Sequence, residues 1–211
     1  CCDYRKINKI IKQESFPLPL LQETIESLAE NPPVWFCSLD FKSAYSSIEL
    51  EPETSEKLTF VTHMGAMKPH RLNFGISTAP SFFQRVLSGV FRDVKYKNLS
   101  VYIDDLLTWH DSIESMIESL SEIFDRVRNV QLRLNGPNCV LGVTEIAYLG
   151  HVLTREGQKV DPAKIEAMTN FARPTNAHFT RSFLGLTQYY KKFIEGYSKI
   201  ATPLNQLLRK D

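Results

Sequence analysis

Near the middle of the chain, two acidic residues interrupt a run of apolar and β-favouring residues. The run extends from Leu99 to Trp109, and the interruption is the pair Asp104-Asp105. This pattern predicts two short strands, 99–103 and 106–109, joined by a tight Asp-Asp turn. Buried strands favour apolar side chains, so the two charges require water or a cation. Taken alone, the pair is consistent with an ordinary solvated turn and with a site for a hard cation such as Mg²⁺.

Other strand-like segments lie on both sides of this pair. The strongest covers residues 34–41, is rich in bulky and aromatic residues, and carries a third carboxylate, Asp40, near its end. Weaker patterns predict further strands at 47–50 and 58–62 around a polar turn at 51–57, a loop at 65–72, and strands at 133–134 and 140–150 around a turn at 135–138.

Helical spacing of apolar residues predicts the remaining elements. The expected helices cover residues 20–30, a segment that opens at 77–80 and runs to 91, residues 113–130, a segment from 161–162 to 171, residues 180–193, and a short segment that ends at 208. The segment 113–130 is the clearest amphipathic helix. We interpret Gln84 as an ordinary polar residue of its helix. Together these elements predict an α+β fold, with a small helical subdomain from residue 159 to the end.

Composition excludes some classes of protein and leaves others open. The chain has 211 residues and a formal net charge of +1, so overall charge gives no argument for nucleic-acid binding. Residues 3–12 are locally basic and could contact phosphates, although a solvated surface explains them equally well. The four cysteines lack zinc-ligand spacing. No apolar run is long enough to cross a membrane, so we expect an intracellular protein with no membrane partner.

The three carboxylates suggest a chemistry. If the strands that carry Asp40 and the Asp104-Asp105 pair are neighbours in one antiparallel sheet, the carboxylates converge at one place. Such a cluster is strongly repulsive without cations, and two Mg²⁺ ions would relieve the repulsion. Two metal ions a few ångströms apart support phosphoryl transfer. The residues by themselves therefore predict metal-dependent phosphoryl chemistry and nothing more specific.

Six ordered motifs resemble those of reverse transcriptases, in particular those of gypsy-like LTR retrotransposons. Two of them contain the carboxylates: 40–45 resembles the first catalytic motif, and Tyr102-Ile103-Asp104-Asp105 resembles the Tyr-X-Asp-Asp motif. The other four, in chain order, are a fingers-like motif in two pieces at 2–9 and 16–19, a nucleotide-site segment at 73–84, a primer-grip-like segment at 148–151 and a segment past the palm at 181–193. The resemblance covers nearly the whole chain.

The resemblance implies a fold, a reaction and a set of ligands. The fold would be a polymerase palm with an antiparallel sheet and packing helices and a partial fingers region in residues 1–158, followed by a helical thumb- or connection-like segment at 159–211. The reaction would be RNA-directed DNA polymerisation, that is, two-metal nucleotidyl transfer from a dNTP to a primer 3′-hydroxyl. The expected cofactor is Mg²⁺, with Mn²⁺ as a second candidate, and the partners are dNTPs and a primed RNA or DNA template.

The resemblance also implies roles for individual residues. Asp40, Asp104 and Asp105 would be catalytic and would hold the metal ions, with the backbone carbonyl of Phe41 as a further ligand. At the nucleotide site, Tyr45 would exclude a 2′-hydroxyl by its bulk, and Phe74 and Gly75 would pack nearby; a core tyrosine is the alternative for Tyr45. Tyr102, Gly150 and His151 would lie near the template-primer, although a structural histidine is an equal alternative for His151.

Several positions depart from the pattern of the family. Ser46-Ser47 replaces a common His-Gln, and Asn73 stands where proline is common. Asn138 stands where a lysine is usual, and an amide cannot act as a general acid for the leaving pyrophosphate. A catalytically decayed remnant that at most binds nucleic acid is therefore the first alternative, and an unrelated two-metal nuclease is the second.

The segment also lacks parts that the resemblance calls for. The basic residues that grip a triphosphate would precede Cys1, and ribonuclease H, integrase or protease regions would lie outside residues 1–211. We therefore expect the chain to be a slice of a larger pol polyprotein.

Overall fold

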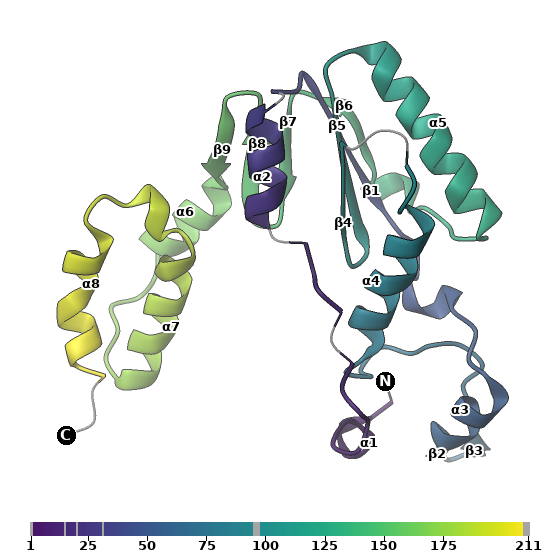
Figure 1. Cartoon of the computed structure of the whole chain (residues 1–211). Coiled ribbons are helices and arrows are strands. Elements are labelled where there is room, and N and C mark those ends of the chain that lie inside the picture. Colours follow the sequence, from purple (N-terminus) through teal and green to yellow (C-terminus); the bar gives the residue numbers. More distant parts are fainter. Residues whose placement is uncertain (1, 15, 20, 31, 95–97, 209–211) are drawn as a thin grey trace. The chain divides into compact units, whose positions relative to one another are not determined.

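The computed structural model describes residues 2–14, 16–19, 21–30, 32–94 and 98–208 of an α+β protein (Figure 1). Its internal contacts divide the chain into two compact units. The first comprises Cys1–Ile146 with Arg155–Gly157, and the second comprises Ala147–Thr154 with Gln158–Asp211. None of the helices in these described ranges combines the length and hydrophobicity needed to cross a membrane.

The elements of the first unit follow the chain in a mixed order. Its helices and 3₁₀ turns are α1 (Arg5–Asn8), α2 (Leu21–Glu30), η1 (Tyr45–Ser47), α3 (Pro52–Lys57), α4 (Ala79–Val90), α5 (Ile113–Asn129) and η2 (Gly136–Asn138). Its strands are β1 (Trp35–Asp40), β2 (Phe60–Thr62), β3 (Gly65–Met67), β4 (Leu99–Tyr102), β5 (Asp105–His110) and β6 (Val140–Val143).

A four-stranded antiparallel sheet in the order β4-β5-β1-β6 forms the centre of this unit. The two central strands, β1 and β5, pair without a break from Trp35 opposite His110 to Asp40 opposite Asp105. The expectation that the strands carrying the three carboxylates are neighbours is therefore confirmed. The prediction of an α+β fold is confirmed as well.

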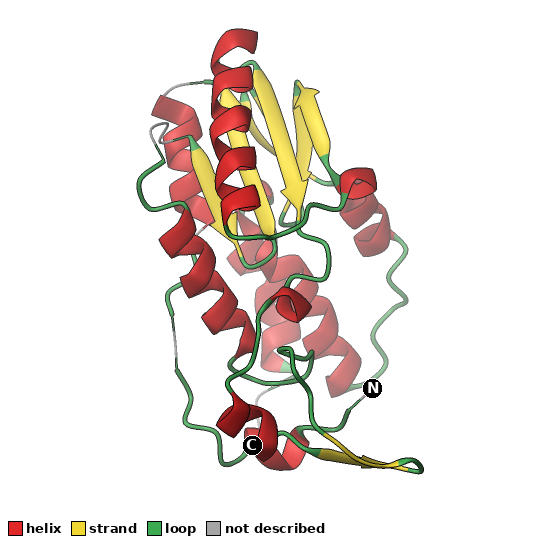
Figure 2. Ribbon diagram, turned by 90° about the vertical axis from the view of Figure 1, so that its right-hand side faces the viewer, coloured by secondary structure: helices red, strands yellow, loops and turns green. Residues whose placement is uncertain are grey.

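Helices α4 and α5 cover one face of this sheet (Figures 1 and 2). Leu39 of β1 lies opposite Leu106 of β5, and both belong to the same core as Phe83 and Leu87 of α4 and Ile123 of α5. Side chains alternate between the two faces of a strand, so the neighbours of these leucines in sequence project from the opposite face.

Several sequence predictions were right in type but shifted at their ends. Helix α5 starts at Ile113 after a Ser112 capping box, in which the Ser112 hydroxyl accepts a hydrogen bond from the Ser115 amide. Helix α2 begins at Leu21, and the expected first residue, Leu20, lies outside the described residues. The turn between β4 and β5 consists of Ile103 and Asp104, whereas Asp105 is already part of β5. The predicted Asp-Asp turn was therefore wrong by one residue.

The segment between β1 and α4 was predicted least well. The expected polar turn at 51–57 is helix α3, which starts with Pro52 after an extended Glu51 and carries a Glu53–Lys57 ion pair one turn apart. The expected strand at 47–50 makes only an isolated bridge, Glu49 with Arg71. Gly65–Met67, expected to be loop, is strand β3, paired with β2 across a two-residue turn.

The second unit contains a small sheet and three helices. The sheet order is β7-β8-β9, with β7 at Glu145–Tyr148, β8 at His151–Thr154 and β9 at Gly157–Val160. The helices are α6 (Pro162–Thr169), α7 (Ala177–Tyr189) and α8 (Tyr197–Gln206), with a 3₁₀ turn η3 at Lys191–Phe193. The predicted helices are confirmed, although α7 starts earlier than expected because the Asn176 side chain caps it. Strands β8 and β9 were not predicted.

Candidate active site

The acidic site lies at one end of the two central strands. Asp40 ends β1 and lies directly opposite Asp105, the first residue of β5, while Asp104 occupies the turn before it. By strand alternation, Asp40 and Asp105 project from the face of the sheet opposite that covered by α4 and α5. The backbone N–H of Phe41 donates to the Asp104 carbonyl over 3.4 Å and ties the two segments together. The structure thus places all three predicted carboxylates together.

Ionisation of Asp105 is unfavourable beside its two neighbouring carboxylates. Burial raises the pKa of the Asp105 carboxyl, and the carboxylates of Asp104 and then Asp40 raise it further. A bound cation would reverse this effect, because it stabilises the ionised carboxylates.

The donor set suits a hard divalent cation in the type of its ligand atoms. Three carboxylates and nearby backbone carbonyls supply the oxygen ligands that Mg²⁺ prefers. Among the described residues, no three His, Cys, Asp or Glu side chains are already gathered as a complete ion site. Asp40, Asp104 and Asp105 would therefore have to turn towards a shared ion.

Two asparagine side chains hold the carboxylate of Asp40. Both donate to the same oxygen, Oδ2: Asn135 Nδ2 at 2.8 Å and Asn138 Nδ2 at 3.0 Å. The backbone amide of Asn135 also donates to the Asp40 carbonyl at 2.8 Å. Asn138, which departs from the family pattern, is therefore a positioning contact for a predicted metal ligand. The carboxylate's second oxygen, Oδ1, accepts from neither amide.

Gln84 was misinterpreted from the sequence. It is only 1 % exposed, and its side chain holds strand β4 and the turn of the acidic hairpin. Its Nε2 donates to the Val101 carbonyl at 2.8 Å, and its Oε1 accepts from the Ile103 amide at 2.6 Å. Ile103 has a φ of 53°, a left-handed conformation that is unusual for a β-branched residue. The available signal was a glutamine among the apolar residues of a core-facing helix.

The predicted nucleotide site is an aromatic cluster beside the carboxylates. The Tyr45 ring packs edge-on against Phe74, with centroids 4.9 Å apart, and against Phe83 at 5.6 Å. Tyr45 is buried whereas Phe74 is 61 % exposed, so the cluster reaches from the core to the surface. Burial raises the pKa of the Tyr45 phenol, and the Asp104 carboxylate adds to the rise. Phe41 joins the cluster through an edge contact with Phe83.

The N-terminal segment fixes the loop that carries Phe74 and Gly75. Asn8 accepts from the Ser77 amide at 2.9 Å and donates to the Gly75 carbonyl at 2.7 Å. Asn73, the other notable departure, donates to the hydroxyl of the buried Tyr4 at 2.9 Å. Gly75 has a φ of 94°, a conformation for which glycine is suited.

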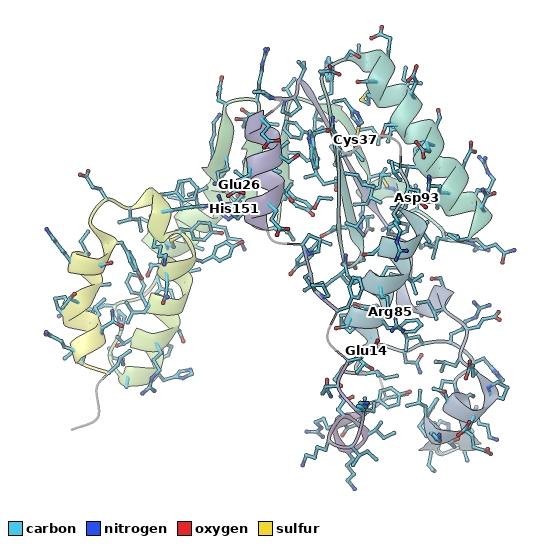
Figure 3. The ribbon with its side chains drawn as sticks, viewed as in Figure 1. Glu14, Glu26, Cys37, Arg85, Asp93 and His151 are labelled. Carbon is cyan, nitrogen blue, oxygen red and sulfur yellow. The ribbon has the colours of Figure 1, made fainter. Side chains whose placement is uncertain are left out.

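The same segment is also tied to α4. Arg85 of α4 pairs with Glu14, and both are labelled in Figure 3. Polar side chains of the N-terminal segment therefore contact both the loop that carries Phe74 and Gly75 and helix α4.

The predicted template-primer residues lie in different places. Tyr102 is half-buried and pairs with Asp105 across the hairpin. Gly150 and His151 belong to the second unit, in the turn and strand that follow β7. This turn is held by α7 and the residue after it, since the Tyr189 and Tyr190 hydroxyls donate to the carbonyls of Leu149 and Gly150, each at 2.9 Å.

His151, labelled in Figure 3, is enclosed by aromatic rings. It is 2 % exposed, and its ring lies 5.2 to 5.9 Å from those of Tyr189, Tyr190 and Phe193. Burial lowers the pKa of His151, and Lys192 lowers it further. Any effect of this neutral imidazole on a primer would therefore pass through the shape of the turn.

Replacement of Gln84 tests its hold on the hairpin. We expect Gln84→Leu to lower the free energy of unfolding by about 2–4 kcal/mol, because it leaves the half-buried Ile103 amide and the buried Val101 carbonyl unpaired. Gln84→Glu should be destabilising at pH 7 and recover towards pH 5, since only the protonated carboxyl can donate to the Val101 carbonyl. Urea unfolding at both pH values measures this. Gln188→Glu, the same change at an exposed position, is the control; equal behaviour of the two Glu variants would contradict the proposed contacts.

Replacement of Asp105 tests the repulsion at the site. Since the folded-state pKa of Asp105 is raised, ionised Asp105 destabilises the fold at neutral pH, and this cost disappears as the pH falls through that pKa. In chelator at pH 7, we expect Asp105→Asn to melt no lower than the parent, with any advantage shrinking in acid. Mg²⁺ should raise the melting temperature of the parent more than that of the variant. Thermal unfolding measures both, with exposed Glu166→Gln as the control. A clear loss of stability in chelator for Asp105→Asn alone would contradict the clustered geometry.

Comparisons with known proteins identify the family of this chain. The family model described as reverse transcriptase (RNA-dependent DNA polymerase) matches residues 1–153. The Pol polyprotein from transposon 297 of Drosophila melanogaster is 33 % identical over 208 residues, covering 99 % of this chain and 20 % of the relative. The Tf2-3 polyprotein of Schizosaccharomyces pombe is 29 % identical over 209 residues, covering 99 % of this chain and 16 % of the relative. The chain therefore spans about a fifth of the length of such relatives.

Solved structures share the fold. The foamy viral protease-reverse transcriptase in complex with dsDNA has a TM-score of 0.87 at 18 % sequence identity, covering 98 % of this chain and 42 % of that one. The same viral protein in complex with an RNA/DNA hybrid gives a TM-score of 0.85, covering 98 % and 28 %. The resemblance to gypsy-like retrotransposon sequences is thus confirmed, and the chain belongs to the reverse transcriptase (RNA-dependent DNA polymerase) family.

Proposed function

We propose that the chain is the polymerising region of a retrotransposon reverse transcriptase and adds nucleotides from dNTPs to a primer 3′-hydroxyl on an RNA template. The observation that carries this proposal is the in-register pairing of Asp40 with Asp105, with Asp104 in the adjoining turn. Residues 1–158 would form the palm with part of the fingers, and 159–211 the thumb- or connection-like segment. Because the substrates are dNTPs, the reaction would take place inside a cell.

The carboxylates would bind two Mg²⁺ ions, or Mn²⁺, which supply charge neutralisation at the reacting phosphate when bound. In the reaction a bond forms between the primer O3′ and the α-phosphorus, and the bond from that phosphorus to the bridging oxygen breaks. The electron pair leaves with pyrophosphate, and the hydroxyl proton passes to solvent. Asp40, Asp104 and Asp105 would ligate the ions together with the Phe41 carbonyl, and Gln84 and the two asparagines would hold these ligands in place.

The nucleotide and the template-primer would contact the neighbouring surfaces. The Tyr45 ring would lie under the sugar of the incoming nucleotide and exclude a 2′-hydroxyl, with Phe74 and Gly75 beside it. Tyr102 would lie near the template-primer, and the Gly150–His151 turn would support the primer. The foamy viral relatives were solved with nucleic acid bound, which supports a template-primer as the partner of this chain.

A catalytically decayed remnant is the second candidate, and Asn138 is the observation in its favour. An asparagine amide cannot protonate the leaving pyrophosphate. Asn138 instead donates a hydrogen bond to the Asp40 carboxylate, so this residue has a structural contact at the site.

Primer extension separates the candidates. With an RNA template, labelled primer, dNTPs and Mg²⁺, we expect extension by the parent chain and by Glu166→Gln, and a loss of at least about a hundredfold in Asp104→Asn. Extension by neither the parent nor the control would favour the remnant. Degradation of the primer-template by the parent would favour the nuclease.

Restoring a lysine at position 138 tests the leaving-group step. We expect Asn138→Lys to raise the extension rate about tenfold or more, because a positioned general acid commonly contributes 10² to 10⁴. The gain should disappear at alkaline pH, as the new lysine loses its proton. Asn138→Gln, which retains an amide, is the matched control. An equal change in both variants, or no pH dependence, would show that protonation by residue 138 is unimportant here.

A further inference from the structure

A polar groove that none of the proposed roles uses lies beside the acidic site. Its volume is about 890 Å³, and four cationic side chains line it: Lys42, Arg71, Arg128 and Arg133. Three serines of the segment that follows Lys42, namely Ser43, Ser46 and Ser47, line it as well, and so does one carboxylate, Glu49. Four cations and one carboxylate in the groove contrast with a whole-chain net charge of only +1.

Two of the four cations are already partly neutralised. Arg71 pairs with Glu49 at 2.8 Å and donates to the Ser47 carbonyl at 2.9 Å. Arg128 pairs with Asp125 at 2.7 Å. Within the described part of the chain, no carboxylate forms an ion pair with Lys42 or Arg133. These two side chains therefore remain available to an anionic ligand.

The groove and the acidic site are built from the same two segments. Lys42 follows Asp40 by two residues, and its backbone amide donates to the Arg133 carbonyl at 2.8 Å. Asn135, two residues after Arg133, holds the Asp40 carboxylate. The Tyr45 ring packs into the aromatic cluster, while its neighbours in sequence line the groove. The groove therefore adjoins the acidic site along both of these segments.

We propose that this groove binds a short chain of linked phosphates, specifically the pyrophosphate released by nucleotidyl transfer. The choice of pyrophosphate rests on the proposed function, whereas the affinity for linked phosphates rests on the groove alone. A compact anion of three to four negative charges matches a group of cations and hydroxyls in a single concavity. The groove cations would compensate the charge of the leaving group at a site where Asn138 cannot supply a proton.

Direct binding tests the groove without requiring polymerisation. Sodium pyrophosphate is titrated calorimetrically into the whole chain in chelator at low salt, so that no metal ion bridges it to the carboxylates. We expect saturable binding with a dissociation constant on the order of 1 mM or tighter, weakened about tenfold in Lys42→Ala/Arg133→Ala. Lys164→Ala/Arg173→Ala removes two exposed cations of the second unit and should bind like the parent. The affinity should also fall as salt is raised.

The outcomes distinguish this proposal from the proposed function. Asp104→Asn should bind pyrophosphate as the parent does, since binding needs no catalytic carboxylate. If the parent does not bind pyrophosphate, or if both double variants bind it equally, the proposal of a phosphate site in this groove is wrong, even if primer extension succeeds. A second titration uses a single-stranded oligonucleotide. If Lys42→Ala/Arg133→Ala lowers the affinity for the oligonucleotide but not for pyrophosphate, the groove holds a nucleic-acid backbone and the proposal is wrong. If the chain binds pyrophosphate but does not extend a primer, the proposed phosphate site is supported and the proposed polymerase function is contradicted.

Discussion

The register of β1 against β5 is the constraint on which the site depends. Six consecutive pairs run from Trp35 opposite His110 to Asp40 opposite Asp105. A slip of one residue would move Leu39 out of the core and turn Asp40 to the helix-covered face, because the side-chain period of a strand is two. Burial of Leu39 and Leu106 against α4 and α5 therefore fixes the register, and the position of the acidic pair follows from it.

Polar side chains from other elements complete the placement. Gln84 reaches from α4 to the hairpin and satisfies the Val101 carbonyl of β4 and the amide of the left-handed Ile103 in the turn. Asn135 and Asn138 approach Asp40 from the segment before β6. The two Gln84 contacts replace water at buried or half-buried groups, so their loss would leave an unpaired donor and an unpaired acceptor, whereas the Asn138 contact is exposed to solvent. The site is thus held by hydrogen bonds from two elements, α4 and the segment before β6.

The sequence predicted the features that depend on local pattern. The long amphipathic helix at Ile113–Asn129, the apolar strands and the three carboxylates follow from periodicity and from a short motif. Helix α3 was missed because it is short and polar, and its only signals are the proline at its start and one ion pair. Gln84 and Asn135 were missed for another reason. Their partners lie 17 to 95 residues away, and nothing in the local sequence indicates which backbone group or carboxylate a polar side chain will meet.

Folding stability alone would favour keeping the asparagines that depart from the family pattern, but it would not favour keeping the acidic residues of the site. Asn73 and Asn138 both have hydrogen-bond partners, and such contacts stabilise a fold whether or not it catalyses a reaction. The acidic pair is different. Burial and two neighbouring carboxylates raise the pKa of Asp105, so at neutral pH the ionised pair costs stability unless a cation compensates it. A chain that had only to fold would gain from an asparagine at position 105, and the three carboxylates of the site are therefore the feature that calls most directly for a bound metal ion.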